Sequence, residues 1–167
     1  NTVGIGLKDL RITNAECGVY VFESTNCVME RIRVESPQTG FELRRSVTNE
    51  IAHSVVHAFT ATGVYSVSSS GTKLEGGAFL TRGSSGICVS VWAGNISVSN
   101  SVFSLDGPAN LAYQIAADGV VDADYNSLQL TNSAMLAVQM GPAVDRAGMS
   151  MTFYDSVSRW VRDASRD

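Results

Sequence analysis

The sequence predicts an all-β fold, a parallel β-helix of roughly six rungs with about 23 residues in each. Three observations lead to this fold. Small or turn-prone residues recur at a near-constant spacing, a short alternating strand follows each of them, and the apolar positions of those strands align in columns. A coil of three short strands and three turns buries its inward side chains only when another coil stacks on it.

The repeat is defined by the residue that precedes the first strand of each rung. Successive starts are nearly equally spaced, with a longer interval after Gly86, and they are Gly18, Gly40, Gly63, Gly86, Ala112 and Met135. Side chains two positions apart share one face of a strand, so apolar columns predict the core. The first column is Val19, Phe41, Val64, Ile87, Tyr113 and Leu136; the second is Val21, Leu43, Ser66, Val89, Ile115 and Val138; the third is Val34, Val56, Phe79, Val102 and Leu128.

Polar residues form columns in the same register. Stacked Asn or Thr side chains can hydrogen-bond from one rung to the next, and Asn and Gly tolerate the left-handed backbone of a sharp corner. The alternative is that they simply mark loops. These columns are Cys27, Asn49, Thr72 and Asn95; Gly77, Asn100 and Asn126; and Cys17, Thr39, Thr62 and Ser85.

The two ends of the chain depart from the repeat. Residues 4–16 read as the second and third strands of an earlier rung, since Ile12 precedes Val34 by the length of one rung. We therefore expect the C-terminal end of a longer β-helix, covering residues 1–153. Residues 154–167 are expected to form a cap, because Val157, Trp160, Val161 and Ala164 make a helical apolar stripe. A frayed tail is the alternative.

Composition excludes some functions. The net charge of −4 argues against a nucleic-acid partner. The sequence has no apolar run long enough to predict membrane insertion as a helix. The three cysteines show no metal-ligand spacing, and we expect three buried thiols rather than a Cys17–Cys27 disulfide.

The rung pattern G-[IV]-x-[VL], followed by a polar turn and further short strands, resembles the pectin-lyase-like superfamily of right-handed parallel β-helices. The resemblance covers about residues 1–140 and concerns the fold. It implies a protein that binds or cleaves polysaccharides, as pectate lyases, polygalacturonases, alginate epimerases and phage tailspikes do. The N-x-D, D-D, G-H-G, D-P-H and R-x-P-x-x-R catalytic blocks of these enzymes are missing, and Arg31-Ile32-Arg33 only partly matches R-I-K.

In this superfamily the first-strand face usually holds the ligand, which implies a binding site on its outward columns. The expected ligand-binding residues are Tyr20, Phe22, Tyr65 and Gln114. Glu42 and Arg44 would be polar handles between the aromatic rings. Outward columns that also hold Val67, Cys88 and Ala116 suit a subunit interface equally well, as in a homotrimer.

A catalytic alternative uses Glu42, Glu23 and Arg44. Glycoside hydrolysis needs two carboxyl groups roughly 5–9.5 Å apart, and Glu23 and Glu42 lie on adjacent rungs. A lyase needs a base, and arginine serves as one in this superfamily. No metal site or cofactor is expected, although the acidic group Asp118, Asp122 and Asp124 could hold a cation such as Ca²⁺.

Two further groups of residues are less specific. His53 and His57 would share a strand face but have no third ligand, so a surface pair is the expectation. Arg31, Arg33, Arg44 and Arg45 would form a basic cluster that could bind uronate carboxylates.

Three functions therefore remain open at the level of sequence. They are polysaccharide recognition by a tailspike-like or other surface protein, a polysaccharide lyase or glycoside hydrolase acting on an acidic glycan, and a structural trimerisation element. Each predicts a secreted, cell-surface or virion location.

Overall fold

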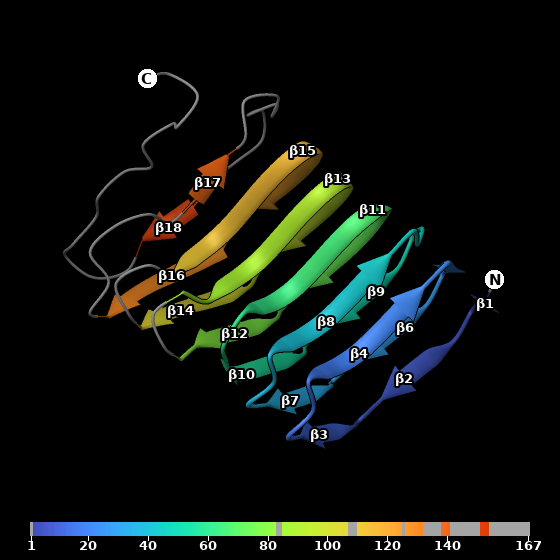
Figure 1. Ribbon diagram of the computed structural model, residues 1–167, viewed down its shortest axis with the longest axis horizontal. Helices are drawn as coiled ribbons and strands as arrows, with labels where there is room; N and C mark the ends of the chain where they lie inside the picture. Colours follow the sequence, from blue (N-terminus) through green and yellow to red (C-terminus); the bar gives the residue numbers. More distant parts are fainter. Residues whose placement is uncertain are drawn as a thin grey trace.

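A computed structural model describes residues 2–82, 85–106, 110–124, 126–131, 138–140 and 151–153. The chain winds as a parallel β-solenoid of about five turns, with about 23 residues per turn (Figure 1). No helix occurs in these described ranges, and thus none that is long and apolar enough to cross a membrane. The predicted fold class is confirmed.

Two long parallel sheets form the walls of the solenoid. The sheet of third strands, here called the third-strand sheet, contains β3 (Arg11–Thr13), β7 (Arg33–Glu35), β10 (Val55–Phe59), β12 (Ala78–Thr81), β14 (Val102–Asp106), β16 (Asn126–Thr131) and β18 (Met151–Phe153). The other wall contains β2 (Gly6–Lys8), β6 (Val28–Glu30), β9 (Glu50–Ala52), β11 (Thr62–Glu75), β13 (Ile87–Ser99), β15 (Leu111–Asp124) and β17 (Val138–Met140).

The first strands of the early turns join the second wall through β11. These are β4 (Cys17–Phe22) and β8 (Thr39–Arg44), and β8 pairs with the first half of β11. From β11 onward, a single long strand covers both the first and the second strand of its turn. A small separate pair joins β1 (Thr2–Val3) to β5 (Ser24–Thr25).

Aligned apolar side chains fill the interior. Along the first strands, successive pairing partners in adjacent turns are Val19, Phe41, Val64, Val89 and Tyr113, and all of them are buried. Along the third strands, Ile12, Val34, Val56 and Phe79 align as predicted. The predicted core is therefore confirmed for the first three turns.

The predicted register is wrong by two positions in the first half of β13. Val64 pairs with Val89 rather than with Ile87, and Tyr65 pairs with Ser90, so Cys88 follows Gly63 in the column of starts. Cys88 is therefore buried and not on the outward face. The physical reason is a longer turn between β12 and β13, whose extra residues delay the strand without changing its stacking.

Later in the same turn the predicted register is wrong by one position only, because the pairing of β11 with β13 shifts between Ser69 and Thr72. Ile96, and not Asn95, pairs with Thr72. Ser101 takes the place predicted for Asn100. Phe103 fills the core column in place of Val102, which is 44% exposed.

Buried serine and asparagine side chains bond one turn to the next. Ser54 Oγ accepts the Ile32 N–H at 3.1 Å and donates to the Ala52 carbonyl at 2.9 Å. Asn49 Oδ1 likewise accepts the buried Cys27 N–H at 2.9 Å. Other buried acceptors of this kind, each bound to a backbone N–H one turn earlier, are Ser46, Ser69, Ser101, Asn110 and Asn126, and exposed Asn95 accepts the Gly71 N–H in the same way. The predicted ladder exists, and much of it is serine.

The corners use a left-handed backbone, but mostly not at Asn or Gly. Asn14 and Asn26 have φ values of 55° and 57°, as expected. Charged residues adopt the same conformation and pair between successive turns. Glu23 lies one turn before Arg45, with 3.4 Å between its Oε1 and Arg45 Nη1. Asp9 lies one turn before Arg31, with 2.6 Å between its Oδ1 and Arg31 Nε. The N–H groups of these four corner residues are paired with carbonyls one turn later, which offsets the steric cost of a left-handed residue.

The ends agree with the sequence where they are described. β2 and β3 stack on β6 and β7, so residues 6–13 supply the second and third strands of a turn. Residues 151–153 form β18, which stacks on β16 within the range 1–153 expected for the β-helix. The helix predicted within residues 154–167 lies outside the described residues.

All three cysteines are free thiols. Cys27 and Cys88 are buried and Cys17 is half-buried. Burial raises the pKa of Cys17, and that of Cys88 well above its usual value, so Cys88 stays protonated at neutral pH.

We predict that Ser54→Ala lowers the free energy of unfolding by about 1–3 kcal/mol, because it leaves the buried Ile32 N–H and Ala52 carbonyl without their hydroxyl partner. Urea titration measures this loss. Ser97→Ala, on the exposed face of β13, is the matched control and should change stability by less than about 0.5 kcal/mol. Equal losses in both variants would show that the hydroxyl ladder does not stabilise the stack.

A second prediction concerns close contact between turns. A Cβ on Gly40 would lie 2.6 Å from the Gly63 carbonyl oxygen and from the Val56 methyl groups. Gly40→Ala should therefore cost about 1–3 kcal/mol through overpacking, measured by thermal or urea unfolding. Gly6→Ala is the control, since its Cβ would meet no atom within 4 Å. A neutral Gly40→Ala variant would contradict the packing.

Candidate functional site

The outward side chains of β4, β8, β11, β13 and β15 form two rows that run along the solenoid axis, here called the first-strand face. The first row is Tyr20, Glu42, Tyr65, Ser90 and Gln114. The second row is Phe22, Arg44, Val67 and Trp92. Neighbouring members of a row stand about 4.8 Å apart at the backbone.

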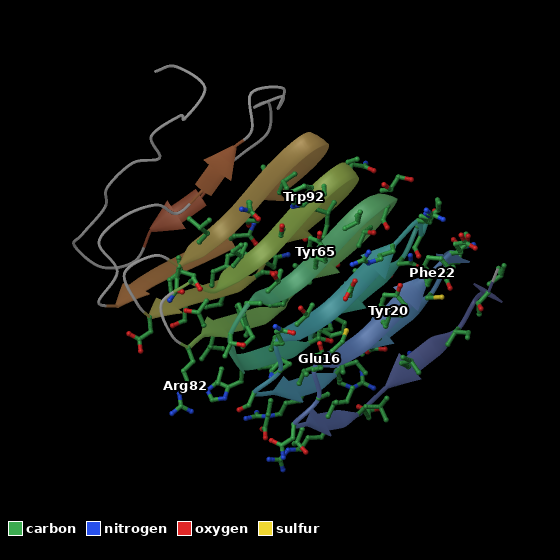
Figure 2. All side chains as sticks on the ribbon, viewed as in Figure 1. Glu16, Tyr20, Phe22, Tyr65, Arg82 and Trp92 are labelled. Carbon is green, nitrogen blue, oxygen red and sulfur yellow. The ribbon has the colours of Figure 1, made fainter. Side chains whose placement is uncertain are left out.

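Exposed aromatic side chains define this face. Tyr20, Phe22 and Trp92 are 55%, 45% and 44% exposed. The Tyr20 and Phe22 rings lie nearly parallel, with 6.2 Å between centroids and 10° between planes. Tyr65 is half-buried, and Figure 2 shows all four residues on the same broad face. Exposed rings gathered on one face of a sheet are an unusual use of apolar surface, which makes this face a candidate interaction site.

Polar groups are held between the rings. Arg44 Nε donates to Glu42 Oε1, and the Arg44 guanidinium lies 5.8 Å from the Tyr65 ring centroid. The hydrogen bond to Glu42 raises the pKa of Arg44, so the guanidinium is always charged. A carboxylate and a ring thus fix the arginine from two sides.

Farther along the first row, two neutral polar residues meet. The Ser90 hydroxyl donates to Gln114 Oε1 at 3.1 Å, and Ser90 is almost completely buried under its neighbours. At the backbone Gln114 pairs with Gln139, and Val138 pairs with Tyr113 rather than with Ile115, so the predicted register of the last rung is wrong by two positions. The Gln114 side chain is part of the face, as predicted.

The two proposed catalytic carboxylates have different settings. Glu42 lies on β8 in the middle of the first-strand face. Glu23 lies at the left-handed corner after β4, where its carboxylate pairs with Arg45. They stand on adjacent turns, as the sequence predicted, and each contacts its own arginine.

The predicted basic cluster does not form. Arg44 lies on the first-strand face, whereas Arg33 lies on β7 of the third-strand sheet, bound to Glu35. Arg31 is at a corner and bonds Asp9 and Glu30. The residues are close in sequence, but a solenoid turn distributes them over different faces.

The other candidates stand apart from this face. His53 is at the left-handed corner before β10 and His57 is on β10, both exposed and away from the first-strand face, so the predicted sharing of one strand face is wrong. Asp118, Asp122 and Asp124 belong to strand β15 rather than to a loop, and their side chains are outside the described part. The described residues contain no group of three His, Cys, Asp or Glu that could hold a metal.

Trp92 is the residue that sequence analysis missed. It pairs with Val67 and shares a row with Phe22 and Arg44. The alternation of inward Val89 and Val91 with outward Ser90 and Trp92 is visible in the sequence. The prediction missed the outward position of Trp92 because it took Gly86 as the start of the rung, whereas that glycine belongs to the longer turn before β13.

Comparison with known proteins agrees with this architecture. The family model described as a right-handed β-helix region matches residues 1–139, and the chain belongs to this family. The predicted fold-level resemblance is thus confirmed. Comparisons with curated proteins and with solved structures gave no significant match.

Proposed function

We propose that this β-helix recognises a polysaccharide through its first-strand face, as part of a surface, secreted or tailspike-like protein. The observation that carries the proposal is the set of exposed rings Tyr20, Phe22 and Trp92, aligned with Tyr65 on one flat sheet. Flat aromatic surfaces cover the apolar C–H face of a sugar ring, and polar groups beside them fix its hydroxyls.

The spacing of the rows supports a chain-like ligand. Tyr20 and Tyr65 stand two turns apart in one row, about 10 Å at the backbone, and Phe22 and Trp92 stand three turns apart in the other, about 14 Å. Several rings set out along an axis suit a ligand with repeated units lying parallel to that axis. A single small molecule would not reach all of them.

The charged pair in the middle supports recognition of hydroxyl and carboxylate groups. Arg44 retains guanidinium N–H groups beyond the one bound to Glu42, because a guanidinium has five. A carboxylate on the glycan can bind this fork, and Glu42 can accept from sugar hydroxyls. Since each of Glu42 and Glu23 is already bound to an arginine, we assign Glu42 to positioning Arg44 rather than to acid catalysis.

We predict that the Tyr20→Ala, Tyr65→Ala double variant loses binding to the polysaccharide that the intact protein selects from a panel of immobilised neutral and acidic glycans. Loss of two stacking rings, each worth about 0.5–1.5 kcal/mol, should weaken binding roughly tenfold or more. Trp92→Ala should weaken it as well.

The control is Val102→Ala, an exposed apolar residue on the third-strand sheet that should leave binding unchanged. Unchanged binding in the double variant would remove this face as the site. A stable trimer in sedimentation with the face buried would show a subunit interface in its place. Release of reducing ends or unsaturated uronates, abolished by Glu42→Gln, would replace recognition with a lyase or hydrolase.

A further inference from the structure

A hollow, here called the groove, lies outside the first-strand face at the carboxyl ends of β10, β12 and β14. It has a volume of about 390 Å³, and the side chains that line it include His57, Leu80, Thr81, Arg82, Ser104 and Asp106. No residue of the two aromatic rows contributes to it. Figure 2 shows Arg82 at the edge of the molecule away from Tyr20, Tyr65 and Trp92.

The strand register explains how this groove is built. His57 pairs with Leu80, and Leu80 pairs with Ser104, so the three form one outward row with Leu80 in the middle. His57 and Ser104 are thus two strand spacings apart, about 10 Å at the backbone. A bulge follows His57, where buried Ala58 has a φ of 58° and the pairing shifts so that Phe59 meets Thr81.

The far end of the groove is closed by charged residues. Arg82 comes two positions after Leu80, and Asp106 comes two positions after Ser104. Thr81 fixes their surroundings, because its Oγ1 accepts the Asp106 N–H and an Asn110 Nδ2–H, both at 2.9 Å. The wall beside Asp106 is therefore rigidly bonded.

Arg82 differs from the other arginines in the described part of the chain. Each of the other five is engaged in an ion pair with a carboxylate, namely Arg11, Arg31, Arg33, Arg44 and Arg45. Arg82 forms no such pair with any described residue and is exposed at the mouth of the groove. An arginine that projects beside an apolar floor and an acceptor side chain is equipped to bind a carboxylate through its planar fork.

We propose that this groove binds a small hydroxylated carboxylate, whether a sugar-acid unit or a free hydroxy acid. The carboxylate binds Arg82, the C–H face of the ligand packs on Leu80, and its hydroxyls bond Ser104, His57 and Asp106. The Asp106 carboxylate at the end of the groove repels a compact multivalent anion, so inorganic phosphate is disfavoured. The site is independent of the glycan face.

The two histidines of the chain provide the test. The intact protein is titrated with sodium glucuronate while the imidazole ring signals are followed by NMR. His57 lines the groove, whereas His53 lies at the corner before β10 and is an internal reference. We expect a saturable shift of the His57 signal with His53 unchanged, and at least tenfold weaker responses to glucose and to phosphate. A parallel titration with tartrate shows whether the groove prefers a free hydroxy acid or a sugar acid.

Matched variants complete the experiment. Arg82→Gln should weaken glucuronate binding at least tenfold, and Asp106→Asn should reduce the preference for glucuronate over phosphate. Arg45→Gln, an exposed arginine at a different corner, should leave the response unchanged. An equal response to phosphate, a shift of both histidines together, or undiminished binding in Arg82→Gln would overturn the proposal. The Tyr20→Ala, Tyr65→Ala double variant changes no residue of this groove. Loss of glucuronate binding at the groove can therefore be distinguished from loss of polysaccharide binding at the first-strand face.

Discussion

The stacking of one turn on the next is the constraint on which this molecule depends. The strand hydrogen bonds run between parallel strands one turn apart in the chain, and so do the bonds from buried Ser54 and Asn49. No turn can bury its apolar side chains or bond its corner N–H groups alone. Stability therefore accumulates along the axis, and each corner must place a polar partner under the corner before it.

That constraint also organises the surface. Because turns stack in register, any outward position becomes a row parallel to the axis, and its chemistry is set by one residue per turn. The corners use this for ion pairs such as Asp9–Arg31, which join charged residues of left-handed backbone on successive turns. The first-strand face uses it for exposed rings, with Arg44 fixed between Glu42 and Tyr65. The corner rows therefore connect successive turns, whereas the rows of the first-strand face present a flat surface outward.

The two proposed sites illustrate how a solenoid separates functions. The first-strand face is flat, aromatic and long, which suits a polymer. The groove beside Arg82 is small, and it lies where the bulge at Ala58 interrupts the outward row. Residues near one another in sequence, such as Arg31, Arg33 and Arg44, instead end on different faces, so a cluster inferred from spacing alone does not form.

Sequence by itself determined the period, the parallel coil, the core columns of the first three turns and the outward placement of Tyr20, Phe22, Glu42, Arg44 and Tyr65. It could do so because those turns have nearly equal length, and equal length converts spacing directly into stacking. Only the tertiary structure decided where Cys88, Trp92 and Phe103 lie, since the turn after β12 is longer and its extra residues shift the register by one or two positions. Inserted turn residues cost little, whereas a strand slipped by one position would bury Trp92 and expose Val91, so packing rather than spacing selects the register.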